Sequence, residues 1–361
     1  MHELVLCIEV IIMTKYEAVA QAIKTDIENG LYKEGQPIPT EELLTVQYDV
    51  SRQTIRKALS LLVEDNLILK RQGSGSVVRP KRLNPRTGKI AVVATYISDY
   101  IFPSQLRAVN DVLSENKYTA VLSATRNCVC NERAILEEIL KNPVDGILIE
   151  GTKSAIPNPN FDLYEKLIEM DIPVVFFNGY YPSLSGTYSV CADNQAGGAE
   201  LVRHLIERGH TKIAGFFKSD DIQGHQRYSG FISELFRNGL IIPDENVFWY
   251  ITETKEELFN NPQEVLNRLG DNTAVVCYND EVAFGLIKCL LSAGRRVPED
   301  VAVVSFDNSN LSRISPVTIT SLSYEDRNIG RIAAQKLVDI LNGKEVTSEV
   351  LPWTFIQKES S

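Results

Sequence analysis

Hydrophobic positions follow two different patterns along the chain. Up to about residue 79, apolar residues recur at helical spacing in short segments. From residue 90 onward, continuous runs of apolar, largely β-branched residues appear at Ile90–Ala94, Thr119–Leu122, Gly146–Ile149, Val174–Phe177, Ile213–Phe217, Ala274–Cys277 and Val301–Phe306. Segments with helical periodicity lie between most of them, at Ser104–Glu115, Glu132–Lys141, Leu163–Met170, Gln195–Arg208, Gly224–Asn238, Pro262–Leu269 and Asp280–Ala293. Apolar strands that alternate with helices predict parallel sheets covered on both faces, and about 270 residues favour two α/β lobes over a single core.

The first 79 residues predict a different and smaller domain. Helices are expected at Tyr16–Asn29 and at Glu41–Tyr48, the second capped by Thr40, and a third is expected to follow Ser51. Two short apolar runs, Leu67–Arg71 and Ser76–Arg79, flank a glycine-rich tip and predict a β-hairpin. Three helices and a hairpin make a winged helix-turn-helix, with bounds that we place at residues 14–79.

The third helix of this domain has the pattern of a recognition helix. Ser51 is a good N-cap, and Ile55, Ala58, Leu59 and Leu62 form one apolar stripe. Polar residues that can reach base edges and phosphates lie off that stripe in the first turns, namely Arg52, Gln53, Arg56 and Lys57. The alternative is that these side chains are simply solvated and that the hairpin tip is only a tight turn.

The order of these motifs resembles the DNA-binding head of the GntR family. The family pattern Ser-Arg-x-Thr-(Val/Ile)-Arg-x-Ala-Leu appears from Ser51 to Leu59, and a Gly-x-Gly wing appears from Gly73 to Gly75. Thr40 and Ser76 stand where the family usually has Ser and Thr, so both hydroxyls are kept. The resemblance implies DNA contacts from the recognition helix, from the wing in the minor groove and from one lysine near the start. The predicted DNA-binding residues are Lys15, Ser51, Arg52, Gln53, Thr54, Arg56, Lys57, Gln72 and Gly73.

Polar side chains gather where the predicted strands of the body end. They are Tyr96 to Phe102, Glu150, Asn178, Lys218, Asn279 and Asp307. Ligands of parallel sheets bind beyond the carboxyl ends of the strands, and such a mixture of carboxylates, amides, tyrosines and a lysine suits a polyhydroxyl ligand. Helix capping is the alternative. We expect capping for Asp280, and both roles stay open for Asn279 and Asp307.

The body resembles the sugar-sensing domain of the LacI family, itself similar to periplasmic sugar-binding proteins. The matching segments are Pro143–Ile149, Asp193–Gly198 with His204-Leu205 and Arg208–His210, Arg227–Phe231, Tyr278–Asp280, and Val297–Val301 through Phe306-Asp307. The resemblance implies that Asn178, Arg227, Asn279 and Asp307 hydrogen-bond a sugar, and that an aromatic side chain near Trp249 packs on its ring. The predicted effector-binding residues are Tyr96, Tyr100, Glu150, Asn178, Lys218, Arg227, Trp249, Asn279 and Asp307.

Charge and composition modify this picture little. The net charge of −10 disfavours a nucleic-acid partner at first sight, but its distribution matters more. Residues 14–79 carry equal numbers of acidic and basic side chains. Residues 80–89, with two prolines and four basic residues, read as a basic linker, so the acidic excess lies in the effector domain at residues 90–361.

Other site classes find little support in the sequence. The six cysteines include no C-x-x-C pair, and the four histidines are not grouped with them, which argues against a metal and suits a reducing cytosol. We find no G-x-G-x-x-G, P-loop or G-x-S-x-G motif, so neither a cofactor nor an enzymatic activity is expected. Residues 1–13 are apolar but interrupted by Glu9 and too short to span a membrane. We predict a non-native or disordered extension there, a cytoplasmic protein and no membrane partner.

A GntR-type head on a LacI-type body resembles one family in particular, the repressors of arabinose utilisation. The segments that favour it are Tyr96–Ser104, Thr152–Ala155 and Phe217–Gly224. The resemblance implies a repressor released by L-arabinose, and two heads of a homodimer would occupy the half-sites of a near-palindromic operator. Another pentose or a sugar phosphate is the alternative effector. A non-regulatory sugar-binding protein is less favoured, because it would need a signal peptide and no DNA-binding head.

Overall fold

The computed structural model describes residues 13–33, 35–65, 67–71, 75–78, 86–324 and 327–361. The chain divides into two compact units, a head that ends at residue 83 and a body that follows it. The predicted extension at 1–13 and the predicted linker at 80–89 lie mostly outside the described residues. Within the described ranges, no helix is long and apolar enough to cross a membrane.

The head contains three helices and a hairpin. They are α1 (Lys15–Glu28), α2 (Glu41–Tyr48), α3 (Arg52–Glu64), β1 (Ile68–Arg71) and β2 (Gly75–Val78). The two strands pair antiparallel. Ile23, Leu44, Ile55 and Ile68 are fully buried in a common core, so each element contributes to a single small hydrophobic centre and the predicted winged helix-turn-helix is confirmed.

Local capping explains where the second and third helices of the head begin. The Thr40 side chain accepts a hydrogen bond from the Leu43 amide (3.4 Å), and the Ser51 hydroxyl accepts one from the Thr54 amide (3.2 Å). These bonds satisfy amides that a helix leaves free in its first turn. Between the two helices Asp49 adopts the left-handed conformation (φ 49°), which reverses the chain and brings α3 onto α2.

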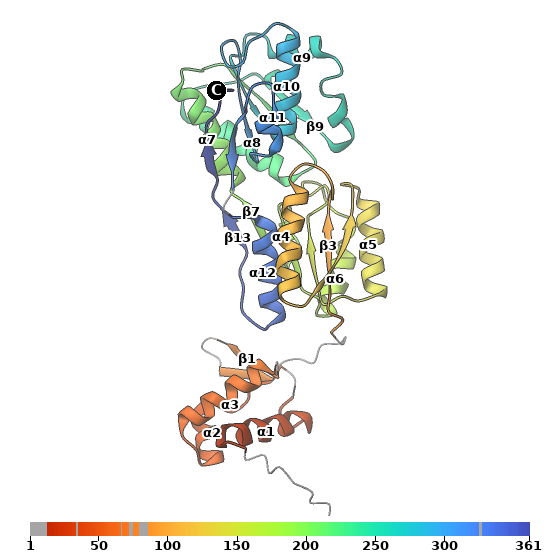
Figure 1. Cartoon of the computed structure of the whole chain (residues 1–361), viewed down its shortest axis with the longest axis vertical. Helices are drawn as coiled ribbons and strands as arrows, with labels where there is room; N and C mark the ends of the chain where they lie inside the picture. Colours follow the sequence, from red (N-terminus) through yellow and green to blue (C-terminus); the bar gives the residue numbers. More distant parts are fainter. Residues whose placement is uncertain (1–12, 34, 66, 72–74, 79–85, 325–326) are drawn as a thin grey trace, which may run out of the picture. The chain divides into compact units, whose positions relative to one another are not determined.

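The body consists of two α/β lobes, shown in Figure 1. In the first lobe the sheet order is β13-β7-β6-β5-β3-β4, with every neighbouring pair parallel. Its elements are β3 (Lys89–Ala94), α4 (Phe102–Glu115), β4 (Thr119–Ala124), α5 (Val129–Lys141), β5 (Gly146–Ile149), α6 (Phe161–Glu169), β6 (Val174–Phe177), β7 (Tyr188–Ala192), α12 (Ile329–Leu341) and β13 (Glu349–Leu351).

The second lobe has the sheet order β14-β12-β11-β10-β8-β9, in which only the pairing of β12 with β14 is antiparallel. Its elements are α7 (Asn194–Glu207), β8 (Ile213–Lys218), α8 (Ile222–Arg237), η1 (Asp244–Asn246), β9 (Val247–Tyr250), η2 (Thr252–Glu257), α9 (Pro262–Leu269), β10 (Ala274–Cys277), α10 (Asp280–Ser292), β11 (Ala302–Phe306), α11 (Asn310–Ile314), β12 (Thr320–Ser323) and β14 (Thr354–Ile356). The predicted pair of parallel α/β lobes is confirmed.

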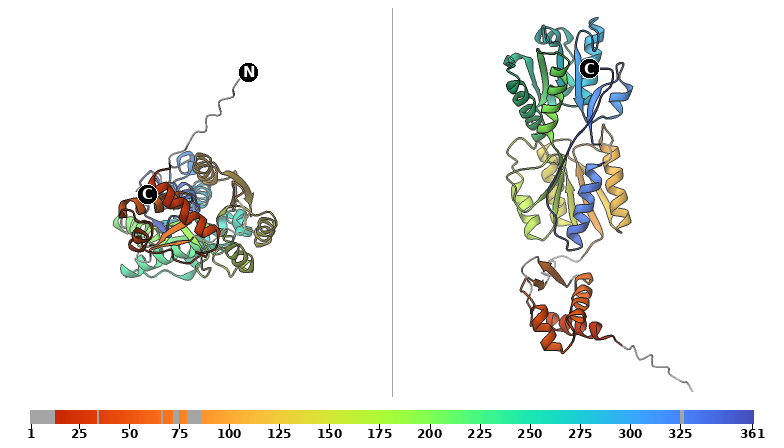
Figure 2. Two further views of the ribbon diagram at one scale, coloured as in Figure 1. Left: turned by 90° about the horizontal axis from the view of Figure 1, so that it is seen from below. Right: turned by 90° about the vertical axis from the view of Figure 1, so that its left-hand side faces the viewer.

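The chain crosses between the two lobes three times. It passes from β7 to α7, returns from β12 to α12, and leaves again from β13 to β14, as Figure 2 shows. The second crossing returns α12 to the first lobe, where Ala333, Leu337 and Val338 are buried among residues of β3, β5 and β6. Three short crossings place the carboxyl ends of both sheets on either side of one gap.

Candidate functional site

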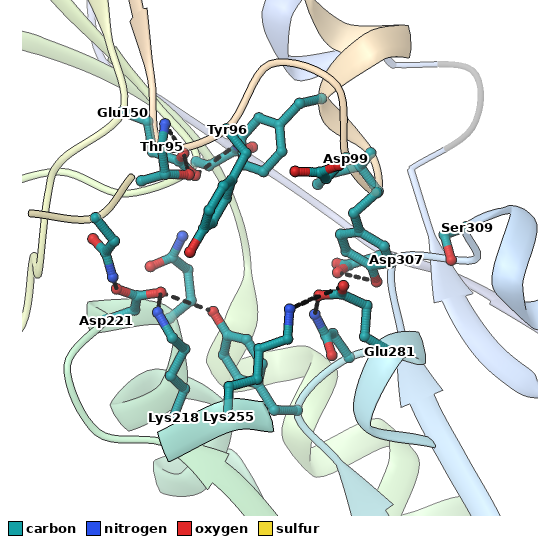
Figure 3. Close-up of a pocket in the computed structure, with 18 of the residues that line it drawn as sticks. Thr95, Tyr96, Asp99, Glu150, Lys218, Asp221, Lys255, Glu281, Asp307 and Ser309 are labelled. Atoms are coloured by element: carbon teal, nitrogen blue, oxygen red, sulfur yellow. Dashed lines mark hydrogen bonds and ion pairs between the residues drawn. The ribbon is translucent and has the colours of Figure 1, made fainter. Parts of the chain in front are cut away.

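A cavity of about 640 Å³ lies between the two lobes. Loops at the carboxyl ends of strands from both sheets line it, which is where parallel sheets generally bind ligands. Figure 3 shows Tyr96, Asp99 and Glu150 of the first lobe facing Lys218, Asp221, Lys255 and Glu281 of the second. The structure brings eight of the nine predicted effector-binding residues to this cavity: Tyr96, Tyr100, Glu150, Asn178, Lys218, Arg227, Asn279 and Asp307.

Arg227, on α8, is the most constrained side chain of the cavity. It is 5% exposed. Its Nε donates to Asn194 Oδ1 (2.9 Å), one terminal nitrogen donates to the Tyr278 carbonyl, and the other donates to Asp307 Oδ1 (3.2 Å). The guanidinium also stacks on the ring of Phe306 at 4.2 Å. Protein groups alone therefore hold this fork in place, and N–H groups are left over for a bound hydroxyl.

Close packing of two helices sets the position of Arg227. A Cβ atom on Gly198 of α7 would lie 2.2 Å from the Arg227 carbonyl oxygen, and one on Gly230 of α8 would lie 1.9 Å from the Gln195 carbonyl. No other residue type fits at such distances, so the two glycines let α7 and α8 touch through their backbones. The contact fixes the rotation of α8 and directs Arg227 into the cavity.

Asp307 and Tyr100 meet across the cavity from opposite lobes. The Tyr100 hydroxyl donates to Asp307 Oδ2 (2.7 Å) and accepts from the backbone amide of Asp280 (3.2 Å). Both Tyr100 (φ 58°) and Asp307 (φ 89°) have left-handed backbones, a conformation that costs energy and concentrates at functional sites. Burial and the neighbouring Asp307 carboxylate raise the pKa of Tyr100 well above its usual value, so its hydroxyl keeps its proton.

A carboxylate and an amide form the wall of the cavity on the first lobe. Glu150 accepts hydrogen bonds from the amide and hydroxyl of Thr95 and from Asn178 Nδ2 (3.3 Å). The Asn178 side chain is also bonded to Gln105 through both of its polar atoms (2.9 and 3.1 Å). Burial raises the pKa of Glu150 to about 7. The wall therefore presents acceptors whose orientation is already determined.

Each cation that lines the cavity is paired with a carboxylate. Lys218 lies 2.6 Å from Asp221 Oδ2, Arg227 lies 3.2 Å from Asp307, and Lys255 lies 3.0 Å from Glu281. Burial alone would lower the pKa of Lys218, but Asp221 and Asp220 outweigh burial and raise it. Further carboxylates, Asp99 and Glu256, also line the cavity. The charges suit a neutral polyhydroxyl molecule better than an anion.

In the head, the polar residues of α3 are presented to solvent. The side chains of Arg52 and Arg56 are both 59% exposed, and Gln53 and Lys57 are exposed as well. Both arginines pair with Glu41 at the start of α2 through their Nε atoms (3.0 Å each). One carboxylate thus holds two basic side chains side by side on one surface.

The remaining predicted DNA-binding residues lie at the starts of α3 and α1 and in the predicted wing. Ser51 caps α3 and its hydroxyl also lies 2.9 Å from the Thr54 hydroxyl, and Lys15 is exposed as the first residue of α1. The predicted wing contacts, Gln72 and Gly73, lie outside the described residues.

Comparison with known proteins agrees with this two-part architecture. Residues 15–78 match the model of bacterial regulatory proteins of the gntR family, and residues 202–361 match the periplasmic binding protein-like domain. The chain is 36% identical over 339 residues to the arabinose metabolism transcriptional repressor of Halalkalibacterium halodurans, covering 91% of this chain and 89% of the relative. The protein of the same name from Geobacillus stearothermophilus is 37% identical over 342 residues, covering 92% and 93%. The chain belongs to the family of arabinose metabolism transcriptional repressors. This confirms the predicted family, and the relatives are repressors rather than enzymes.

Solved structures support the fold of the repressor's body. The transcription regulator CcpA of Lactococcus lactis is 26% identical, with a TM-score of 0.67, and its alignment covers 76% of this repressor and all of the CcpA chain. The LacI-like arrangement of two lobes that was expected from the sequence is therefore confirmed.

Two sequence expectations about the repressor's cavity need correction. Trp249 does not line the cavity and is 41% exposed, in contact with Tyr228 and His225. Because successive residues of a strand face opposite sides, it is the next residue of β9, Tyr250, that faces the cavity. The expected capping by Asp280 is also wrong, since Asn279 caps α10 through the Val282 amide (3.1 Å). Asp280 instead accepts from the Ser309 amide (2.6 Å).

The repressor's cavity includes residues that the sequence did not single out. Tyr278 and Trp353 pack against the Arg227 guanidinium, and Tyr324 also lines the cavity. Asp221 pairs with Lys218, and Lys255 pairs with Glu281. Tyr278 adjoins the predicted Asn279, and Asp221 follows the predicted Lys218 by three residues, so the ends of β10 and β8 indicated where both would lie. Trp353 lies on the third crossing between the lobes, where no strand or helix pattern had been recognised.

Proposed function

We propose that this repressor binds operator DNA as a homodimer and releases it when L-arabinose occupies the cavity between the lobes. The cavity carries the proposal, because it combines a fixed guanidinium fork at Arg227 with acceptors at Asp307, Asn178 and Glu150. Vicinal hydroxyl groups of a sugar both donate and accept hydrogen bonds. The guanidinium can donate to them, and the carboxylate and amide oxygens can accept from them. The names of the close relatives support arabinose among the possible sugars.

The charges favour a free pentose over a phosphorylated one. A phosphate group would need unpaired cations or free amides, whereas Lys218, Arg227 and Lys255 are already neutralised by carboxylates. Adding a dianion beside these carboxylates would cost electrostatic energy that a neutral sugar avoids. We therefore expect the sugar phosphate to bind more weakly than the sugar.

The exposed face of α3 supports the DNA-binding part of the proposal. Arg52 and Arg56 stand in the first turns of the helix, where side chains reach base edges in the major groove. Their shared partner Glu41 keeps them extended from one surface. These surface ion pairs are weak, so the arginines can exchange Glu41 for guanine or phosphate at little cost.

We propose that the two copies of the homodimer contact each other at the edge of the first-lobe sheet. Strand β4 is the terminal strand of that sheet, and Val121 and Leu122 on it are 43% and 48% exposed. Exposed apolar residues on an edge strand are a liability for a monomer, and pairing with a second copy would cover them. Sugar binding would then shift operator affinity through the dimer by a coupling of about 1–3 kcal/mol.

Calorimetry and a gel-shift titration test the proposal together. We expect L-arabinose to give a saturable binding heat that D-xylose, D-ribose and an arabinose phosphate do not match. On a fragment upstream of an arabinose-utilisation gene, we expect a retarded complex that L-arabinose dissociates, and light scattering should report two copies of the chain. A phosphosugar that bound more tightly would overturn the effector assignment, and no retarded complex at low salt would favour a non-regulatory sugar-binding protein.

A further inference from the structure

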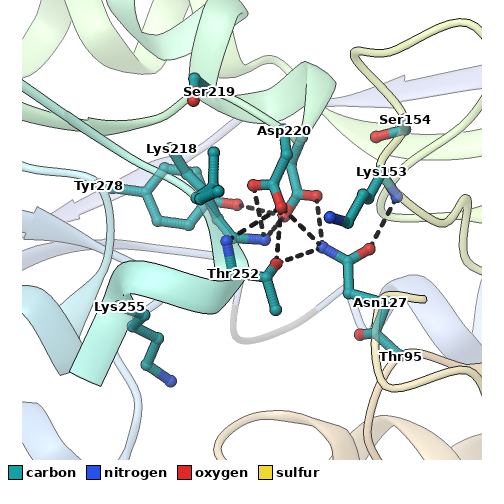
Figure 4. A network of polar contacts seen from close by, with 12 residues as sticks. Thr95, Asn127, Lys153, Ser154, Lys218, Ser219, Asp220, Thr252, Lys255 and Tyr278 are labelled. Carbon is teal, nitrogen blue, oxygen red and sulfur yellow. Dashed lines mark hydrogen bonds and ion pairs between the residues drawn. The ribbon is translucent and has the colours of Figure 1, made fainter. Parts of the chain in front are cut away.

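Polar loops of the two lobes meet directly along one side of the cavity. From the first lobe come the turn before α5, with Asn127, and the loop after β5, with Lys153 and Ser154. From the second lobe come the loop after β8, with Asp220, and the segment after β9, with Thr252. Figure 4 shows Asn127, Asp220 and Thr252 meeting in one polar network, with Lys153 and Ser154 beside it. The contact is therefore made by the protein's own side chains and backbone.

Asn127 is the centre of this contact. Its Nδ2 donates to Thr252 Oγ1 (2.6 Å), to Asp221 Oδ1 (3.1 Å) and to Asp220 Oδ2 (3.4 Å). Its Oδ1 accepts from the backbone amide of Lys153 (2.7 Å). Asn127 is 1% exposed and Asp220 is fully buried. A single amide side chain thus joins two loops of its own lobe to two loops of the other.

Two further hydrogen bonds join the lobes beside Asn127. The Ile222 amide, the first of α8, donates to Ser154 Oγ (3.0 Å), and the Ala155 amide donates to the Asp220 carbonyl (3.2 Å). Lys153 also forms an ion pair with Glu253, but this pair is partly exposed and contributes little. The buried hydrogen bonds therefore account for most of the attraction between these loops.

Both sides of the contact are anchored within their own lobes. Asp220 Oδ2 accepts from the amide (3.0 Å) and hydroxyl (2.7 Å) of Thr252 and Lys218 lies 3.2 Å from Oδ1. On the other side, the single proton of the Tyr181 hydroxyl is shared between the Thr152 carbonyl (2.8 Å) and the buried Glu132 carboxylate (2.7 Å). Preorganised partners lose little entropy when they meet, so each hydrogen bond between them is worth more.

The backbone at the contact is held in an unfavourable conformation. Asn127 (φ 53°) and Lys153 (φ 43°) are both left-handed. Asparagine tolerates this conformation, but for lysine it is energetically unfavourable. Such a conformation persists only where its surroundings fix it. In this protein the Lys153 amide is held by Asn127, which itself depends on the second lobe.

We propose that Asn127, Ser154, Asp220 and Thr252 form a sugar-independent clasp that holds the two lobes together and thereby sets the sugar concentration at which the repressor releases DNA. Asn127, Thr252, Lys218 and Asp221 also line the cavity, so the clasp adjoins the sugar site. A ligand that requires closed lobes binds with an apparent affinity proportional to the fraction already closed. The clasp residues are positioning residues, and this role rests on the proposed sugar site.

Three variants and one matched control test the clasp, and the variant of Ser154 separates it from direct sugar contact. Asn127→Gly removes the amide and keeps a residue that accepts a positive φ. Thr252→Val replaces the hydroxyl with a methyl group, and Thr252→Ser is its matched control because it keeps the hydroxyl. Ser154→Ala removes an acceptor that bridges the lobes without lining the cavity. We expect Asn127→Gly, Thr252→Val and Ser154→Ala each to weaken L-arabinose binding about 5- to 30-fold, since each loses one or more buried hydrogen bonds, and Thr252→Ser to bind like the wild type.

The readouts are calorimetry with L-arabinose, the sugar concentration that releases half of the bound operator fragment, and hydrogen exchange of the sugar-free protein. In the sugar-free variants, peptides covering residues 151–156 and 219–223 should exchange faster than in the wild type, while peptides from the core strands should not change. A wild type that binds no L-arabinose would refute the proposed function, yet the exchange measurement would still decide the clasp. Unchanged exchange and unchanged sugar affinity in Asn127→Gly and Ser154→Ala would overturn the clasp.

Discussion

Replacing Arg227 with lysine tests the sugar site most directly. The guanidinium makes three hydrogen bonds, to Asn194, the Tyr278 carbonyl and Asp307, and stacks on Phe306. Lysine keeps the positive charge, which prevents the buried Asp307 from being left alone. One ammonium group cannot reproduce the planar fork, so Asn194 and the Tyr278 carbonyl lose their donor.

The size of the effect follows from the hydrogen bonds that a sugar would lose. A hydrogen bond to a charged group contributes about 1.5–3 kcal/mol, and the fork directs its remaining N–H groups at the ligand. Arg227→Lys should therefore weaken L-arabinose binding about 10- to 150-fold, at about 1.4 kcal/mol per tenfold change. Operator affinity without sugar should stay at the wild-type value, because Arg227 belongs to the body and not to the head.

Calorimetry measures the affinity for L-arabinose, and a gel shift measures the operator affinity with and without the sugar. Another arginine of the same helix provides the control. Arg237, at the end of α8, is 70% exposed and pairs with Glu234 on the surface, so Arg237→Lys should leave sugar binding unchanged. Circular dichroism should show the same fold for both variants. If Arg227→Lys bound L-arabinose as tightly as the wild type, or if both variants lost affinity equally, the assignment of the fork to the sugar would be refuted.

Three further predictions concern the head, a buried carboxylate and pH. Arg56→Ala should weaken binding to the operator by about 1–3 kcal/mol if Arg56 reads a base. A gel shift with the operator fragment and with a scrambled fragment measures this. An equal loss of affinity for the two fragments would show that Arg56 contacts only phosphate. Glu132→Leu should lower the free energy of unfolding by about 3 kcal/mol, because four buried side chains each lose one hydrogen-bond acceptor, namely those of Asn158, Asn160, Tyr164 and Tyr181. An unchanged urea midpoint would contradict this. Burial raises the pKa of Glu150 from 4.5 to about 7, so the native state holds an extra proton between these values and stability should fall as pH rises through that window. Thermal melts of Glu150→Gln should show a shallower decline than the wild type between pH 5 and 7, and parallel curves would count against the assignment.

The regular parts of the fold were predictable because local patterns determine them. Strands β5, β6 and β10 have the predicted bounds because each is a continuous apolar run buried on both faces. The missed elements are those whose pattern depends on a distant partner. Helix α12 packs on the first lobe although the preceding strand, β12, belongs to the second, and β12 itself reads Thr-Ser-Leu-Ser, which resembles a loop.

The candidate site was predictable where it follows strand ends and unpredictable where it depends on side-chain geometry. Asn178 and Asp307 follow strands directly and Asn279 follows β10 after one intervening residue, so the rule for parallel sheets located them. Trp249 and Tyr250 are adjacent in the sequence, and only the pairing register of β9 against β8 decides which of the two side chains faces the cavity. The second-lobe partners of Asn127 lie 93 to 125 residues further along the chain, so no local pattern could have revealed the clasp.

The three crossings between the lobes have a consequence for folding during synthesis. The core of the first lobe needs α12 and β13, which are encoded after every helix and most strands of the second lobe. The ribosome must therefore finish nearly the whole body before the first lobe can close over its apolar strands. We expect nascent chains that stop before residue 329 to expose that surface and to recruit chaperones, even though their second lobe lacks only β14.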